Sequence, residues 1–286
     1  MFLVVIGLLY DHPRWEEKEI CRVAEVLGYK VLPLNVERIV LDLNKRAEWI
    51  NAADIFLQRS VSFYKAYAYS YYVEAFGGIV VNSSSTIWNC GNKFITTLLL
   101  SKAGIPTPKA YLVSSRTAAL EVAEVIGYPV VVKPVIGGWG RYVVKADTRD
   151  SLDGVLELKE SLGAIYNLHY VQEFVNKPGR DIRVFVVGDN VPVAIYRVNK
   201  SYWKTNTALG AKAEPLKVDE ELEKLALKVA NVVGGGILGI DIFEDPERGY
   251  LVNEVNANVD FRNTVRVTGY NLARDIVEYI VSLVKR

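Results

Sequence analysis

Short apolar runs alternate with amphipathic segments in the first third of the chain. Residues 2–9, 30–35, 54–57 and 79–82 form apolar runs that predict buried strands. Residues 15–27 and 63–76 place apolar side chains at helical spacing and predict helices. Alternating strands and helices indicate an open, parallel α/β sheet over residues 1–88.

Two features of this first segment point to an interface or a ligand. Tyr64, Tyr67 and Tyr71 share one face of the second predicted helix, which favours a core position or a subunit interface. Ligands of parallel α/β sheets bind beyond the carboxyl ends of the strands, and Asp11 and Arg59 follow such ends here. We therefore expect Arg59 either to bind an anion in a shared cleft or to lie on the surface.

Two lysines in the middle of the chain stand in unusual positions. Residues 92–103 predict a helix that ends at Gly104, and Lys93 lies in its first turn, where a cation opposes the helix dipole. This position favours a nearby anion, with an exposed lysine as the alternative. Lys133 interrupts the apolar strand predicted over residues 129–134. Because burying an unpaired lysine is costly, we expect Lys133 to face a cleft and a phosphate.

A glycine-rich loop follows this strand. Gly137, Gly138 and Gly140 precede a second predicted strand over residues 142–146. Such a loop is either a hairpin turn or a flap whose amides cover phosphates. It lacks the GK[ST] residues of a Walker loop.

The last third begins with a strand over residues 170–175 that leads to Pro178 and Gly179. Its end either offers free backbone groups to a purine edge or is an ordinary strand end. Residues 181–187 and 192–198 predict a hairpin, and residues 219–233 and 271–284 predict helices. Basic residues exceed acidic ones six to two between residues 176 and 206, which predicts a positive wall able to bind phosphates or carboxylates.

A second hairpin carries acidic residues inside apolar strands. Residues 237–243 and 250–255 flank a turn-prone segment, with Asp241 in one strand and Glu254 in the other. Glu254 and Asn256 share a face because they are two residues apart. A six-residue connection over 245–250 places Asp241 opposite Glu254, whereas a five-residue connection turns it to the other face. The first register gathers oxygen ligands suited to Mg²⁺, and the alternative is edge-strand acids that face water.

Composition excludes several classes of protein. The chain has 286 residues, half of them hydrophobic, with 34 Lys and Arg against 33 Asp and Glu, so no basic field predicts a nucleic-acid partner. No run of 18 apolar residues predicts a membrane span, and the apolar start lacks the basic region of a signal peptide. Cys21 and Cys90 fit no metal spacing and predict buried thiols in a reducing, cytoplasmic compartment.

Five motifs in order resemble the ATP-grasp carboxylate–amine ligases of the LysX/ArgX (RimK-like) family. They are NCGNK (89–93), KPVIGGWGR (133–141), VQEFVNKPGRDIRVFVVG (171–188), TNTALG (205–210) and VNEVNANVDFRNT (252–264). The resemblance covers nearly the whole chain and is weakest in the first 60 residues. It implies an ATP-grasp fold with a pre-ATP-grasp domain over 1–88, a central subdomain over 89–171 and a C-terminal subdomain over 172–286.

The resemblance also implies a role for each motif residue. ATP would contact Lys93, Lys133, Gly137, Gly138, Trp139, Gly140, Arg141, Tyr142, Val143, Gln172, Glu173, Phe174, Val175, Arg180, Asp181, Arg183 and Asn206. Two Mg²⁺ ions would bind Asp241, Glu254 and Asn256. The amino-acid substrate would contact Arg197, Thr207, Ala208, Asp260, Phe261, Arg262, Asn263 and Thr264. Arg183, Arg197 and Asn256 would act in catalysis. His12 and His169 lie outside the motifs, and we expect both to be structural.

The implied reaction joins the α-amino group of 2-aminoadipate to the side-chain carboxyl of the glutamate that ends the small acidic carrier protein LysW, through an acyl phosphate. Relatives that use glutamate carry Gly-Phe where this chain has Asn263-Thr264, which favours aminoadipate. The preceding ANVDF departs from the HTMEF of aminoadipate enzymes, so one enzyme using both amino acids stays an alternative. The others are glutamate ligation to a different protein, as in RimK-type enzymes, and an ATP-binding scaffold without turnover. We expect a homo-oligomer, either a dimer or a tetramer.

Overall fold

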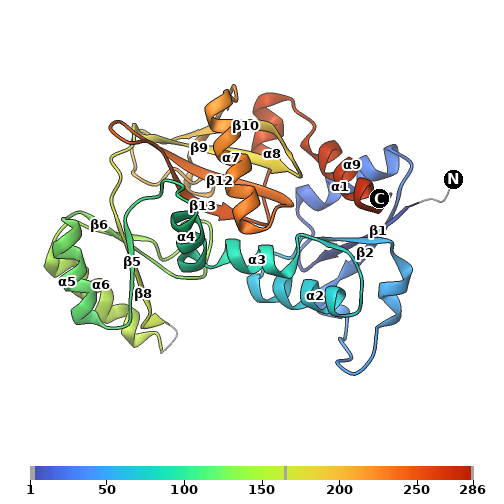
Figure 1. Cartoon of the computed structure of the whole chain (residues 1–286), viewed down its shortest axis with the longest axis horizontal. Coiled ribbons are helices and arrows are strands. Elements are labelled where there is room, and N and C mark those ends of the chain that lie inside the picture. The colour runs from blue at the N-terminus through green and yellow to red at the C-terminus, as the bar shows by residue number, and fades with distance from the viewer. Residues whose placement is uncertain (1–3, 164–165, 285–286) are drawn as a thin grey trace.

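The structure, a computed structural model, describes residues 4–163 and 166–284 of the chain. Within those ranges the strands form two four-stranded sheets and one five-stranded sheet. Figure 1 shows the five-stranded sheet above, with the other two sheets below it on either side. No helix of these ranges is long and apolar enough to cross a membrane.

The first sheet is parallel, in the order β2-β1-β3-β4, which confirms the predicted open α/β arrangement. Its elements are β1 (Val5–Tyr10), α1 (Trp15–Val26), β2 (Lys30–Asn35), β3 (Ile55–Gln58), α2 (Phe63–Ala75) and β4 (Val80–Val81). One face packs on α2 through Phe56 and Val73. The other packs on α1 and on the last helix, α9 (Leu272–Val284), through residues such as Ile6, Ile20 and Ile276. The C-terminal helix is therefore part of the first sheet's core.

The tyrosine stripe of α2 does not face that core. Tyr64 and Tyr71 are more than half exposed, and the buried face of α2 carries Ala66, Ser70 and Val73. The predicted core position is therefore wrong. Apolar residues surround this helix on most sides, so periodicity alone could not select its buried face.

The second four-stranded sheet is antiparallel, in the order β5-β8-β6-β7. It comprises β5 (Ala110–Val113), β6 (Val130–Lys133), β7 (Val144–Ala146) and β8 (His169–Glu173), with α5 (Arg116–Ile126) and α6 (Arg149–Ser161) packed on it (Figure 1). Two helices, α3 (Ser84–Gly91) and α4 (Lys93–Lys102), run beneath the five-stranded sheet between the other two. The sequence had predicted α4 but not α3, whose polar start resembles a loop.

The five-stranded sheet has the order β11-β10-β9-β12-β13. Its strands are β9 (Arg180–Val187), β10 (Asn190–Val198), β11 (Lys212–Leu216), β12 (Ile237–Asp245) and β13 (Gly249–Asn256). The amphipathic helix α7 (Glu220–Val233) is capped by the Asp219 side chain and covers one face with Leu222, Ala226 and Val229. A short helix, α8 (Arg262–Thr268), follows β13.

A bulge sets the register of the β12–β13 hairpin. The predicted six-residue connection is wrong, because the turn spans residues 246–248 and Glu244 pairs with Tyr250. Asp241 nevertheless lies opposite Glu254, since Asn253 is an extra residue on β13 between that pair and the pair of Ile242 with Val252. The register that gathers the acidic residues is thus confirmed, by a bulge rather than by a longer turn.

Arg59 joins the first sheet to the chain that follows β13. It is 3 % exposed, pairs with Glu17 at 2.9 Å and donates to the carbonyl of Val259 at 2.9 Å. Both expectations for Arg59, a ligand anion or an exposed surface, are therefore wrong. Burial raises the pKa of Glu17, but Arg59 and Arg14 lower it by more than burial raises it. The pKa therefore lies below its ordinary value, and the carboxyl is ionised in the fold.

We expect Arg59→Ala to destabilise the protein by about 3–5 kcal/mol, because it leaves Glu17 charged and buried without its partner. The measurement is the free energy of unfolding in denaturant. Arg22→Ala is the matched control, since Arg22 forms an exposed ion pair with Glu19 on α1, the helix that carries Glu17. Equal stability of the two variants would contradict the structural role of Arg59.

Candidate active site

Three cavities meet where the five-stranded sheet faces the other two sheets. The first, of about 700 Å³, lies between β6, β8 and β12. The second, of about 1170 Å³, lies between β13, α8 and the start of α1. The third, of about 970 Å³, lies between α2, α3 and the end of β13. Of all the described residues, Glu254 alone lines all three cavities.

The first cavity contains the two lysines that the sequence singled out. Lys93 donates to the Gly137 carbonyl at 2.6 Å and lies 3.5 Å from Glu254. Lys133 donates to the side chain of Asn253, the bulge residue of β13, at 2.7 Å. Both lysines are buried, so Lys93 is not the exposed lysine of the alternative interpretation. Burial lowers the pKa of Lys133 to about 7, because nearby Glu254 only partly offsets the loss of hydration.

The glycine loop connects β6 to β7 and lines the same cavity with Gly137, Gly138 and Gly140. Gly140 has φ 69°, and a β-carbon there would lie 2.9 Å from the side-chain oxygen of Asn206, so only glycine fits without strain. Lys204 donates to the Gly140 carbonyl at 3.2 Å. Arg141 and Val143 also line the cavity, whereas Tyr142 points to solvent and lines none of the three.

The end of β8 forms another wall of the first cavity, through Gln172, Glu173, Phe174 and Val175. The carboxylate of Glu173 accepts from the Lys109 amide at 2.8 Å and pairs with Arg248 at 2.6 Å. Arg248 belongs to the turn between β12 and β13, so this pair ties the two sheets together across the cavity.

A ladder of charged residues crosses four strands of the five-stranded sheet. Asp241 on β12 lies directly opposite Arg183 on β9 and Glu254 on β13. Arg183 donates two bonds to Asp241, at 2.7 and 2.8 Å, and Arg197 donates a third at 3.0 Å. Burial raises the pKa of Asp241, but Arg183 and Arg197 outweigh it, so the carboxyl stays ionised.

Arg197 on β10 continues the ladder. It lies opposite Asp181 on β9 and donates two bonds to it, at 2.7 and 2.8 Å. Asp181 also accepts from Thr205 and lies 3.4 Å from Lys177. The predicted positive wall is therefore largely neutralised by carboxylates. Arg180 lies outside the cavities, where it pairs with Glu244 and stacks on Tyr196 at 4.1 Å.

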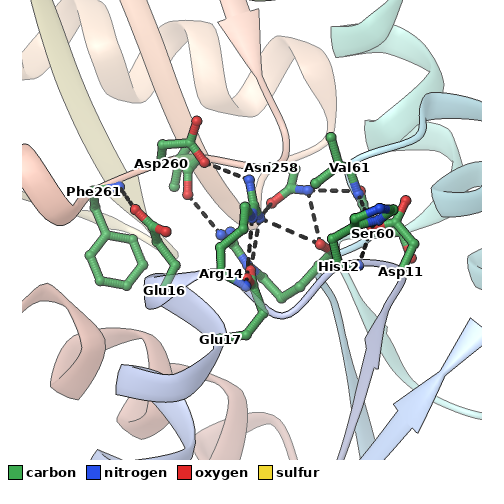
Figure 2. Close-up of polar contacts among 12 residues, drawn as sticks. Asp11, His12, Arg14, Glu16, Glu17, Ser60, Val61, Asn258, Asp260 and Phe261 are labelled. Atoms are coloured by element: carbon green, nitrogen blue, oxygen red, sulfur yellow. Dashed lines mark hydrogen bonds and ion pairs between the residues drawn. The ribbon is translucent and has the colours of Figure 1, made fainter. Parts of the chain in front are cut away.

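The second cavity gathers most of the residues predicted to bind the amino acid. It is lined by Arg183, Arg197, Asn206, Thr207, Asp260, Arg262, Asn263 and Thr264, together with Asp241, Glu254 and Asn256. Phe261 is fully buried beneath it, and the side chain of Ala208 lies outside the described part of the structure. Figure 2 shows that Arg14 and Glu16, from the start of α1, also reach this segment.

The acidic cluster offers oxygen donors for a divalent cation. Among the described residues, no three His, Cys, Asp or Glu side chains form a group that could hold a metal ion. The predicted set is instead two carboxylates and one amide, from Asp241, Glu254 and Asn256, which all line the second cavity. Hard oxygen donors of this kind are the ligands that Mg²⁺ takes, so the donor chemistry fits.

The third cavity is more apolar, with Phe63, Ala66 and Ile87 among its lining residues. It contains a buried hydroxyl, that of Ser60, which is 1 % exposed and has no hydrogen-bond partner in the described structure. Gln58 and Asn258 also line it. Sequence reasoning placed the loop after β3 near a shared cleft, but it did not identify this cavity.

Neither histidine lines any of the three cavities. The expectation that both are structural is not met by His12, whose side chain is 72 % exposed. His169 is fully buried on β8, where burial lowers its pKa to about 4. Sequence reasoning missed Arg14, Glu16 and Asn253, which all line the cavities. The Asn253 side chain contacts Lys133 because of the bulge, and nothing in the sequence marks a bulge at that position.

A solved ATP-grasp structure has a similar shape. The RimK domain protein ATP-grasp from Sphaerobacter thermophilus superposes with a TM-score of 0.81, at 21 % identity over 97 % of this chain and 100 % of that one. The fold is therefore the ATP-grasp fold, as the resemblance implied.

The sequence identifies the family. Residues 90–280 match the RimK-like ATP-grasp domain, and residues 6–88 match the LysX preATP-grasp domain. The chain therefore belongs to the RimK-like ATP-grasp family. This confirms the resemblance and the class, ATP-dependent carboxylate–amine ligases, which bind ATP and typically Mg²⁺.

Two relatives in this family differ in their sequence identity to the chain. The alpha-aminoadipate–LysW ligase LysX of Saccharolobus solfataricus is 50 % identical over 275 residues, which cover 96 % of this chain and 100 % of that protein. The glutamate–LysW ligase ArgX of Sulfurisphaera tokodaii is 36 % identical over 279 residues, covering 96 % of this chain and 97 % of that protein.

We expect Lys133→Met to stabilise the protein in the absence of nucleotide and metal. The folded pKa of about 7 lies below the ordinary value of 10.5, so between these values only the unfolded chain holds the proton. Wild-type stability from this group therefore rises with pH by ~1.4 kcal/mol per unit. The gain in the free energy of unfolding of Lys133→Met over the wild type, measured in denaturant, should be largest below pH 7 and shrink toward pH 10. Lys109→Met, at an exposed lysine, is the control, and an advantage independent of pH would contradict the expectation.

Proposed function

We propose that this protein joins the α-amino group of 2-aminoadipate to the side-chain carboxyl of the C-terminal glutamate of a LysW-type carrier protein, at the expense of ATP. The identity to LysX, 50 % against 36 % to ArgX, supports aminoadipate as the amino acid. Asn263 and Thr264, which line the second cavity, support the same choice.

The observation that carries this proposal is the meeting of three cavities at Glu254. A ligase of this kind brings together a nucleotide, an amine and a carboxylate, and each needs its own approach to one reaction centre. The first cavity has six basic and four acidic lining residues, which suits a polyanion such as ATP. The second has four of each, which suits an amino acid that carries both charges. The third has few charges and suits the end of a peptide.

We assign ATP to the first cavity. Lys93 and Lys133 would meet phosphates, the glycine loop from Gly137 to Val143 would cover them, and residues 172–175 would face the adenine. The nucleotide would then lie between a central subdomain over 89–171 and a C-terminal subdomain over 172–286, with residues 1–88 as the pre-ATP-grasp domain. Four of the predicted ATP contacts do not line this cavity and would contribute only after a rearrangement, namely Trp139, Tyr142, Arg180 and Arg183.

We assign two Mg²⁺ ions to Asp241, Glu254 and Asn256. When bound, the ions would neutralise charge that develops on the transferred phosphoryl group. The chain's own residues hold the surrounding charges in place: Arg183 and Arg197 fix Asp241, and Lys93 lies next to Glu254.

The chemistry proceeds by positioning and electrostatics. The side-chain carboxylate of the carrier's C-terminal glutamate attacks the γ-phosphate of ATP, which gives an acyl phosphate and ADP. The amine of aminoadipate then attacks the acyl carbon, and the tetrahedral oxyanion collapses to the amide and phosphate. Arg183, Arg197 and Asn256 would stabilise the charges of these steps. Since Nε and Nη2 of Arg197 are held by carboxylates, contact with the amino acid would fall to Nη1.

Carrier and assembly complete the proposal. The carrier's last residues would enter the third cavity, where the unpartnered hydroxyl of Ser60 could bind a polar group of the peptide.

The exposed tyrosines of α2 would form a homo-oligomer contact, in a dimer or a tetramer. Of the two thiols predicted to be buried, Cys90 is buried and Cys21 is only half-buried; as free thiols, both support a reducing cytoplasm.

We expect purified protein with ATP and Mg²⁺ to raise the mass of a LysW-type carrier by one aminoadipate minus water, measured by mass spectrometry. Glutamate in place of aminoadipate should react more slowly. Equal rates would indicate a bifunctional enzyme, and modification of an unrelated protein alone would favour RimK-type ligation. ATP binding without turnover of any amino acid would favour a scaffold and refute the proposal.

We expect the double change Asn263→Gly and Thr264→Phe to move preference from aminoadipate toward glutamate. Thr264 is buried at the wall of the second cavity, so a phenylalanine there would shorten the space for the longer amino acid. The measurement is the ratio of kcat/KM for the two amino acids, which should shift by about tenfold or more, as for loss of a methylene's fit. The exposed change Arg266→Ala, one turn along α8, is the control. An unaltered ratio would show that the pair is not the selector.

A further inference from the structure

Four consecutive residues at the start of α1 hold the segment that leads into α8, three by direct contact and the fourth through Arg59. Arg14, just before the helix, donates to Asp260 at 2.5 Å and to the Asn258 side chain at 3.2 Å (Figure 2). The ring of Trp15 packs edge-on against Phe261, with 5.7 Å between ring centroids. Glu17 pairs with Arg59, which holds the carbonyl that precedes Asp260.

The remaining residue of the four, Glu16, supplies the cap that α8 lacks. One of its carboxylate oxygens accepts from the backbone amides of Phe261 at 3.1 Å and Arg262 at 3.0 Å. The cap position of α8 is Phe261, whose side chain has no acceptor. A helix of seven residues is marginal by itself, and this carboxylate from α1 satisfies two amides at its start and complements its dipole.

The first turn of α8 contains Asn263 and Thr264, and Asp260 precedes it. Asp260 also accepts from the indole of Trp139 in the glycine loop, at 3.2 Å. The first sheet's helix and the loop over the first cavity therefore hold the same carboxylate at the mouth of the second cavity.

We propose that Glu16 is a positioning residue for amino-acid selection. It lies in the pre-ATP-grasp domain, caps α8 and so fixes Asn263 and Thr264 against the substrate. The inference rests on the proposed function, because it takes the first turn of α8 as the place where the amino acid is selected. The preference for one amino acid over another then depends on the pre-ATP-grasp domain as well as on the C-terminal subdomain, which carries Asn263 and Thr264.

The test compares Glu16→Ala and Glu16→Gln with Glu19→Ala, a control at an acidic residue that pairs with exposed Arg22 on the same helix. We expect Glu16→Ala to raise the KM for aminoadipate about fivefold to tenfold, the size of a lost helix cap, and to narrow the preference over glutamate. The KM for ATP should stay within about twofold, because the first cavity does not include Glu16. Glu16→Gln keeps an acceptor oxygen and should restore most of the wild-type KM, whereas Glu19→Ala should match the wild type.

Hydrogen exchange of the amides in residues 261–266 gives a second measurement that needs no turnover. We expect faster exchange in Glu16→Ala than in Glu19→Ala. Equal exchange and equal KM in these two variants would overturn the inference. A wild-type protein that ligates no amino acid to the carrier would overturn the proposed function instead, and the exchange comparison would still decide whether Glu16 caps α8. If Glu16→Ala does not fold, Glu16→Asp carries the test, because a carboxylate one methylene shorter loses its bonds to the two amides. A raised KM for the amino acid with an unchanged KM for ATP supports the inference, whereas an unchanged KM for the amino acid or an equal rise in the KM for ATP overturns it.

Discussion

The buried carboxylate of Asp241 is the constraint on which the site depends. It is 2 % exposed, and a buried charge is tolerated only when opposite charges and hydrogen-bond donors surround it. Arg183 and Arg197 meet that requirement from two neighbouring strands, each in direct cross-strand register with a carboxylate. A slip of one residue between these strands would leave several charges buried and unpaired. The charge ladder therefore specifies the register of β9, β10 and β12, and with it the position of every residue at the shared edge of the cavities.

The bulge at Asn253 completes this arrangement. It lets Glu254 stand opposite Asp241 while the rest of β13 continues to pair with β12 toward the turn. The bulge also directs the Asn253 side chain to Lys133. One backbone irregularity therefore places Glu254 opposite Asp241 and also contacts the buried lysine of another sheet. Bulges often re-aim a side chain beside a functional site, and this one brings two sheets to a common point.

Sequence reasoning predicted the parts of the fold that local patterns control. The parallel first sheet, the strand with Lys133 and the capped helix α7 all follow from periodicity and end signals. The same reasoning failed where tertiary contacts decide. Arg59 follows a strand as a ligand-binding residue would, but its partner Glu17 is 42 residues away and cannot be seen in local spacing. The stripe of Tyr64, Tyr67 and Tyr71 on α2 looked like a buried face, yet the buried residues of this helix are Ala66, Ser70, Tyr72 and Val73. Motif resemblance supplied most residues of the candidate site, but not Arg14 or Glu16, which belong to no motif.

The two kinds of cation at the site play different parts. The planar, always charged guanidinium suits a fixed bidentate pair, and Arg183 and Arg197 are each held in this way by a buried carboxylate. Lys133 instead donates to a neutral amide oxygen, and Lys93 donates to a carbonyl, with Glu254 at the longer distance of 3.5 Å. A lysine bonded to neutral oxygens can exchange those partners for a phosphate at little cost, whereas removing an arginine from its carboxylate strands a buried charge. The arginines thus maintain the architecture of the cleft, and the lysines, kept at the expense of stability, leave positive charge available for a nucleotide.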